Sequence, residues 1–278
     1  RSTTPFARSR RRSRSSPSSG RSRDRATTFF NRGLLYNGIG EHDKAISDLT
    51  AAISLGQRKS DAFAFRGHSY MELGRNGEAL KDLNQALAID PRNELAFRYR
   101  GMVHSAMKQS EKAILDYTSA LRIDPNKEDA YYLRGTEYLE LRDCAKAIPD
   151  FNKALSIRAT YEAFTNRASC FFRSKQYDRA IADHGEALRL LPDAGGTFLR
   201  RGRAYAAKGD APAAIADFAR VTDKNAKEDT VLIAQAKLAD LKGEREKATT
   251  MYNAVLRLND LDDELKAEVT ERLKKLTQ

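Results

Sequence analysis

The chain has no tryptophan and only two cysteines among its 278 residues. Cys144 and Cys170 are too few for the disulfide framework of a small secreted domain, and their spacing does not match a zinc site. We therefore expect two free thiols, which favours a reducing compartment. No apolar run of about 18 residues is present, so the sequence predicts neither a membrane-inserted helix nor the apolar core of a secretory signal.

Acidic residues are almost absent from residues 1–25, which hold nine arginines and only one acid, Asp24. Nine positive charges less one negative charge give this segment +8 of the chain's net +11. Because the segment also lacks a hydrophobic pattern, it is expected to be a tail that is disordered when free. The remaining +3 belongs to residues 26–278, so strong basicity is confined to the tail.

Four interpretations of this basic tail remain open. Its composition is typical of a segment that contacts nucleic acid or another polyanion, of an organelle transit segment and of a segment controlled by serine phosphorylation. The fourth is an extension foreign to the native protein. Without a targeting role for the tail, the expected location is the cytoplasm; with one, it is an organelle matrix or the nucleus.

Small residues recur through the rest of the chain at a step of 33 or 34 residues. They are Gly33, Gly67, Gly101, Gly135, Ala168, Gly202 and Ala236. A large apolar residue precedes each by four positions, and an alanine follows each by twelve. Positions i, i+4 and i+7 share one face of a helix, and prolines such as Pro91 and Pro125 end a second helix. Each unit is thus predicted to be a helix–turn–helix hairpin in a stacked array.

This order of aromatic, glycine, tyrosine, alanine, aromatic, alanine and proline resembles the tetratricopeptide repeat family. The resemblance covers seven units in residues 26–262. It implies an all-α, right-handed superhelical solenoid of antiparallel helix hairpins, whose first helices line a concave groove. A leucine and valine stripe in residues 263–278 predicts an amphipathic C-terminal capping helix.

Residues suited to catalysis are scattered among different units. The four histidines show no catalytic or metal-binding spacing, and His104 and His184 stand where sister units carry aromatic residues. We therefore expect core histidines whose hydrogen bonds are satisfied, no cofactor or metal, and no enzyme activity. The favoured function is a scaffold or adaptor that binds a partner peptide or helix in the groove. The alternative is an assembly factor of RNA or ribonucleoprotein, anchored by the basic tail.

The family's groove positions are the second, fifth, ninth, twelfth and thirteenth of each first helix. In units three to six they predict a partner-binding site at Arg98, Met102, Tyr132, Thr136, Leu139, Ser169, Phe172, Arg173, Leu199 and Arg203. Exposed aromatic residues and arginines often anchor interfaces, and Tyr132, Leu139 and Phe172 are expected to have no core role. Acidic neighbours such as Glu162 predict a ligand with apolar anchors and mixed or basic charge.

The lysines and asparagines with which some family members clamp the two carboxylates of a chaperone tail are not matched. The clamp requires lysine at the fifth position and asparagine at the ninth position of one first helix. In unit four, for example, these positions are Tyr132 and Thr136. No unit carries the required pair, so no binding of chaperone tails through this clamp is expected.

An arginine precedes the small residue in units one to six, and an aspartate follows that arginine by sixteen residues. Unit seven has lost both, with Gln235 and Met251 in their places. Joint presence and joint loss predict a ladder of Arg–Asp ion pairs along the helix packing.

Overall fold

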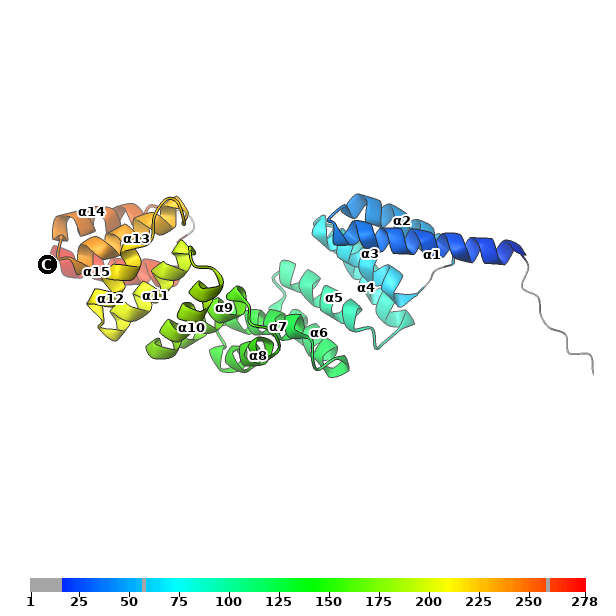
Figure 1. Ribbon diagram of the computed structural model, residues 1–278, viewed down its shortest axis with the longest axis horizontal. Helices are drawn as coiled ribbons and strands as arrows, with labels where there is room; N and C mark the ends of the chain where they lie inside the picture. Colours follow the sequence, from blue (N-terminus) through cyan, green and yellow to red (C-terminus); the bar gives the residue numbers. More distant parts are fainter. Residues whose placement is uncertain (1–16, 57–58, 259–260) are drawn as a thin grey trace, which may run out of the picture. The chain divides into compact units, whose positions relative to one another are not determined.

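The computed structural model describes residues 17–56, 59–258 and 261–278, which contain fifteen α-helices and no strand (Figure 1). The chain divides into two compact units, one up to Pro125 and one from Asn126. The predicted all-α array of helix hairpins is confirmed. In the described part of the chain, no helix is long and apolar enough to cross a membrane.

The first unit contains three hairpins. Their helices are α1 (Pro17–Gly38), α2 (His42–Ser54), α3 (Ser60–Glu72), α4 (Asn76–Ile89), α5 (Glu94–Ala106) and α6 (Ser110–Ile123). The second unit contains four hairpins and a terminal helix. These are α7 (Glu128–Glu140), α8 (Cys144–Ile157), α9 (Tyr161–Arg173), α10 (Tyr177–Leu190), α11 (Gly195–Lys208), α12 (Ala211–Ala219), α13 (Glu228–Leu241), α14 (Arg245–Val255) and α15 (Asp263–Thr277).

The first helix begins earlier than the sequence predicts. Helix α1 starts at Pro17, so residues 17–25, assigned above to the disordered tail, are helical. Proline is well suited to the first helical position because its missing N–H needs no partner there. Arginine is also a good helix former. Residues 17–25 thus extend the first helix of the first repeat toward the N-terminus. The rest of the predicted tail, residues 1–16, lies outside the described residues.

The recurring glycines allow the two helices of a hairpin to approach closely. A Cβ added at Gly101 would lie 2.6 Å from Cε1 of Tyr117, and one at Gly202 would lie 2.6 Å from Cε1 of Phe218. Both rings are buried and come from the second helix of the same hairpin. Glycine therefore offsets its cost in the helix interior by making room for the core aromatic ring.

The predicted Arg–Asp ladder is present, and each pair lies within one hairpin. The pairs are Arg32–Asp48, Arg66–Asp82, Arg100–Asp116, Arg134–Asp150, Arg167–Asp183 and Arg201–Asp217. In every pair Nε and Nη2 of the arginine donate to the two carboxylate oxygens over 2.5–2.9 Å. The hydrogen bond to Asp217 raises the pKa of Arg201. These bidentate pairs fasten each first helix to its second helix.

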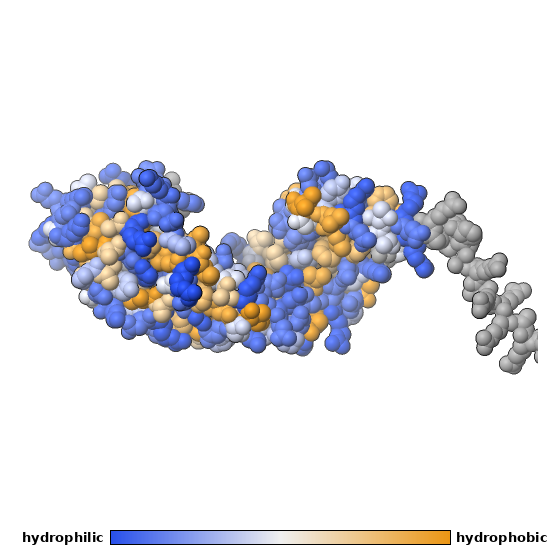
Figure 2. All heavy atoms as spheres, in the orientation of Figure 1, coloured by the Kyte–Doolittle hydropathy of each residue, from blue (hydrophilic) through white to orange (hydrophobic). Residues whose placement is uncertain are grey.

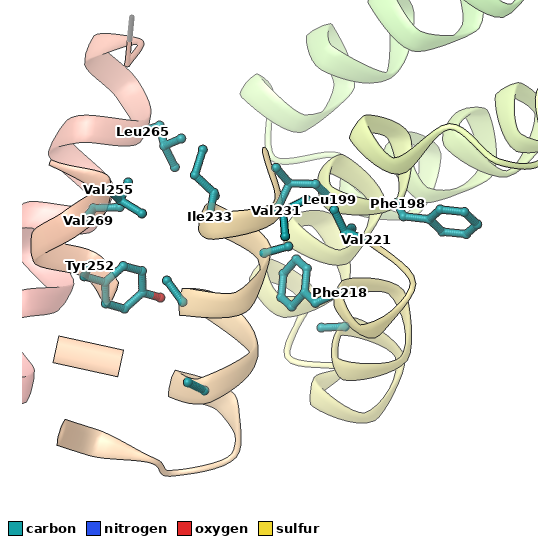
Figure 3. Packing of buried hydrophobic residues seen from close by; sticks show 14 of the residues in the cluster. Phe198, Leu199, Phe218, Val221, Val231, Ile233, Tyr252, Val255, Leu265 and Val269 are labelled. Carbon is teal, nitrogen blue, oxygen red and sulfur yellow. The ribbon is translucent and has the colours of Figure 1, made fainter. Parts of the chain in front are cut away.

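The core of the second unit continues into α15. Leu265 and Val269 of α15 are buried in the same cluster as Tyr252 and Val255 of α14 (Figure 3). Asp262 caps the start of the helix, because its side chain accepts a hydrogen bond from the backbone N–H of Leu265 over 2.8 Å. Helix α15 thus covers apolar surface that the last hairpin would otherwise expose to water.

Candidate functional site

Two predicted groove residues, Arg98 and Met102, lie on α5 of the first unit. Within α5, Nε of Arg98 donates to Glu94 over 2.9 Å, and its guanidinium lies 5.1 Å from the centre of the Tyr99 ring. Met102 packs against the core formed by α3, α4 and α5. Both side chains thus have contacts within their own unit. The other eight predicted residues lie on α7, α9 and α11 of the second unit.

The groove positions of α7 are occupied largely by packing. Tyr132 accepts a hydrogen bond from Nδ2 of Asn166 on α9 over 3.3 Å, and its ring lies 6.2 Å from that of Phe151. Burial raises the pKa of the Tyr132 hydroxyl, and its hydrogen bond with Thr136 partly offsets the effect. Leu139 packs against the core cluster that contains Phe151. The expectation that Tyr132 and Leu139 have no core role is therefore wrong.

Two further groove positions are also engaged. Leu199 of α11 is 8% exposed and belongs to the core of the second unit. Ser169 of α9 donates its hydroxyl to the carbonyl of Thr165 over 3.0 Å, as Thr136 does to Tyr132 over 2.9 Å. First helices in this unit pack closely enough that several groove positions become contact positions. A single repeat's sequence does not reveal this.

The remaining predicted residues meet α15. The guanidinium of Arg203 lies 5.3 Å from the centre of the Phe172 ring, and its Nη2 donates to Glu268 of α15 over 2.8 Å. Arg173 lies 3.5 Å from Glu264, one helical turn earlier on α15. Phe172, which also contacts Tyr177, does not have the free ring that the sequence predicted. Phe172, Arg173 and Arg203 are thus brought together on one surface.

Lys237 of α13 completes this surface. Its side chain is 9% exposed, and Nζ donates to the second carboxylate oxygen of Glu268. Burial lowers the pKa of Lys237 below its ordinary 10.5, although Glu268 opposes that effect. Burial would raise the pKa of Glu268, but Lys237 and Arg203 outweigh it and hold that pKa below 4.5. We call Phe172, Arg173, Arg203 and Lys237 the Phe172 face.

Two cavities open beside the Phe172 face. On the side of the second unit that Figure 2 shows, apolar surface lies among hydrophilic residues. The larger cavity, of about 500 Å³, lies between α11, α13 and α15 and is lined by Phe172, Arg203, Ala206 and Lys237 among others. The smaller, of about 230 Å³, lies between α9, α10, α11 and the start of α15. Phe172 and Arg203 line both cavities, so a ligand in either one would contact them.

Family models match most of the repeat array. A TPR repeat model matches residues 67–108, one tetratricopeptide repeat model matches residues 132–197, and another matches residues 26–55 and 100–127. The chain is a tetratricopeptide repeat protein. No curated protein matches its sequence.

Several solved structures share this fold. A tetratricopeptide repeat protein from Parabacteroides merdae is 20% identical, with a TM-score of 0.62 over 92% of this chain and 100% of that chain. PilW, a type IV pilus biogenesis factor, is 22% identical, with a TM-score of 0.62 over 76% and 98% of the two chains. YrrB, described as having an unusual peptide-binding site, is 18% identical, with a TM-score of 0.58 over 73% and 96%. At these identities the likeness concerns the fold.

Sequence reasoning for this tetratricopeptide repeat protein missed Lys237, which belongs to the Phe172 face, and two acids beside that face. Lys237 and Arg203 occupy the same position of successive repeats, 34 residues apart, and this was a usable signal for a column of positive charge. Glu264 and Glu268 are four residues apart and share one side of a helix. Because α15 follows the last repeat, no sister sequence indicated which helices they would meet.

The two thiols and His184 are buried, whereas His42, His68 and His104 are partly exposed. Cys144 and Cys170 are both free and buried, and burial raises the pKa of the Cys170 thiol. Such a thiol is protonated at neutral pH and therefore a poor nucleophile. Among the described residues, no group of three or more potential ligands is placed to hold a metal ion.

Proposed function

We propose that the protein is an interaction scaffold that binds an extended segment or amphipathic helix of a partner protein on the Phe172 face. One observation carries this proposal: Phe172 and Arg203 stack against each other and line both cavities. An aromatic ring and an arginine beside a concave surface are typical of interface anchors. The peptide-binding site described for YrrB supports the same class of function for this fold.

The binding face is narrower than the sequence predicted. Tyr132, Leu139 and Leu199 are held by contacts within the second unit, so they serve mainly to position α7, α9 and α11. Phe172, Arg203 and the neighbouring Ala206 and Ala207 border the larger cavity. The two alanines leave room for a partner side chain above α11, between Phe172 and α15.

The proposal is tested with peptides selected from a random library displayed on phage, using the full chain as bait. Binding of a selected peptide is then measured for wild type and for Phe172→Ala. Loss of an anchor worth more than about 1.4 kcal/mol weakens binding at least about tenfold. Circular dichroism checks that each variant keeps its helix content.

A matched control is Phe164→Ala, because Phe164 lies on the same helix and its ring packs against Arg167 instead. We expect binding by this variant to stay within about threefold of wild type, since Phe164 lines neither cavity. Equal weakening in both folded variants, or none in Phe172→Ala, would remove the Phe172 face from consideration.

A further inference from the structure

The smaller cavity contains a histidine at a position that is aromatic or aliphatic in the sister hairpins. His184 stands where other units have Leu83, Tyr117, Phe151 and Phe218. It is 1% exposed, and its Nδ1 has no hydrogen-bond partner among the described residues. Burial, with Arg200 and Arg201 nearby, lowers the pKa of His184 to about 3, so the imidazole is neutral near pH 7. A buried neutral imidazole without a partner destabilises the fold, since both ring nitrogens seek hydrogen bonds.

A second residue that lines this cavity also has an unsatisfied polar atom. Nε of Arg203 is buried and has no hydrogen-bond partner in the described part of the chain, although Nη2 of the same guanidinium donates to Glu268. Arg203 and His184 line the cavity together with Ser169, Phe172, Arg173 and Arg200. Two residues with unsatisfied buried polar atoms, His184 on α10 and Arg203 on α11, thus line one cavity.

The charges around the cavity favour a single negative charge. Three arginines line it, and two acids, Asp262 and Glu264, line it at the start of α15. Asp262 already caps α15, and Glu264 already pairs with Arg173. Arg200 is exposed and has no ion-pair partner within the described residues. The Nε–H of Arg203 and the guanidinium of Arg200 therefore remain as donors for a ligand.

We propose that this cavity is a carboxylate pocket, which receives an acidic side chain or the C-terminal carboxylate of the partner segment bound on the Phe172 face. A carboxylate of the chain itself is already bound in this way next to the pocket, because Glu268 accepts hydrogen bonds from Arg203 and Lys237. A doubly charged phosphate is disfavoured by Asp262 and Glu264. This ligand differs from the mixed or basic one that the sequence predicted.

The pocket is unlike the two-carboxylate clamp considered above, whose ligands come from first helices. Here the deepest group, His184, comes from a second helix, α10. The inference rests on the proposed function only in assigning the carboxylate to a partner segment; the pocket itself is tested with a small probe.

The experiment uses the full chain labelled with ¹⁵N and ¹³C and titrated with N-acetylglutamate α-amide. We expect saturable shifts of the His184 ring signals and of the Arg203 Nε–H signal, with a Kd on the order of 10 mM. The uncharged N-acetylglutamine α-amide is expected to bind at least about tenfold more weakly. Inorganic phosphate is the third probe and is expected to bind more weakly than the glutamate probe.

The chain offers a matched variant, Ala168→Gly/His184→Phe, which restores the pair found at Gly135 and Phe151. Both changes are needed because a Cβ at position 135 would lie 2.9 Å from Cε1 of Phe151. We expect this variant to fold and to lose the Arg203 shift. A second variant, Arg200→Gln, alters only an exposed lip residue and is expected to weaken probe binding about threefold or more.

Absence of saturation below about 100 mM, equal binding of the glutamine probe, tighter binding of phosphate, or an unchanged response in the double variant would each overturn the carboxylate assignment. Failure of this pocket is distinguishable from failure of the proposed function. Peptide binding that depends on Phe172 without a probe response rejects the pocket alone. A probe response without Phe172-dependent peptide binding keeps the pocket and rejects the partner face.

Discussion

Hairpins six (α11–α12) and seven (α13–α14) of the second unit are held together by different charged groups. In hairpin six, Arg201 and Asp217 form a bidentate pair between the two helices. Hairpin seven has Gln235 and Met251 at these positions. Its buried carboxylate is Asp240 on α13, which accepts hydrogen bonds from Arg272 of α15 over 2.8 Å.

The difference shows what the end of a repeat array requires. A hairpin within the array has neighbours on both sides, and its ion pair joins its own two helices. The last hairpin must also hold the terminal helix. Tyr252 of α14 donates its hydroxyl to Asp240 over 3.0 Å, so one carboxylate fastens both α14 and α15 to α13.

The two ion pairs also differ in exposure. In the Arg201–Asp217 pair the side chains are 21% and 6% exposed, whereas in the Arg272–Asp240 pair they are 47% and 9% exposed. Water screens the guanidinium of Arg272 much more than that of Arg201. The pair within the hairpin should therefore contribute more to stability.

The largest effect is expected from Arg201→Met. Removing this arginine leaves Asp217 buried without its partner, which costs roughly 3–5 kcal/mol of unfolding free energy. Chemical denaturation measures the loss. Asp217→Asn and the double variant complete a double-mutant cycle. Additive losses, with no coupling energy between the two sites, would show that the pair is not a unit.

A smaller effect is expected from Arg272→Met. Because Arg272 is nearly half exposed, we expect a loss of about 1 kcal/mol, confined largely to α15. Hydrogen exchange should show faster exchange in α15 with little change in α11. The control is Lys275→Met, whose partner Glu271 lies in the same helix and where both side chains are 60% exposed. If the two variants have equal effects, Asp240 does not fasten α15.

The sequence predicted the structural features that recur in several repeat units. The hairpins, the close approach at Gly101 and the Arg–Asp ladder each appear in several units, so joint presence and joint loss identify the partners. Contacts that occur once could not be found in this way. Tyr132 contacts α9 because two neighbouring hairpins pack against each other there. The residue spacing within one repeat does not encode how neighbouring hairpins pack.

Helix α15 and His184 show the same limit at the candidate site. The stripe of Leu265 and Val269 predicted an amphipathic helix, but not which charged residues Glu268 would meet. His184 was correctly expected to be buried, because it replaces an aromatic residue, but the expectation that its hydrogen bonds are satisfied was wrong. Its unsatisfied Nδ1 depends on the groups that surround it in three dimensions.

The smallest effect is expected from lowering the pH, which protonates Glu268. Lys237 and Arg203 hold the pKa of Glu268 below its ordinary 4.5 despite its partial burial. A carboxylate with a lowered folded-state pKa stabilises the folded state fully above its unfolded pKa, and this contribution is lost as pH falls through the folded-state pKa. The docking of α15 should therefore weaken below about pH 4.5.

Hydrogen exchange of α15, corrected for the intrinsic rate, should show this loss of protection as the pH falls from about 5 to about 3. The effect is expected to be modest because 43% of the Glu268 side chain is exposed. In Glu268→Gln the acid-dependent part should disappear, while protection of α11 stays unchanged in both proteins. The same acid dependence in wild type and Glu268→Gln would assign the loss to another carboxylate, such as Asp240, and so separate the two acids by which the last hairpin holds α15.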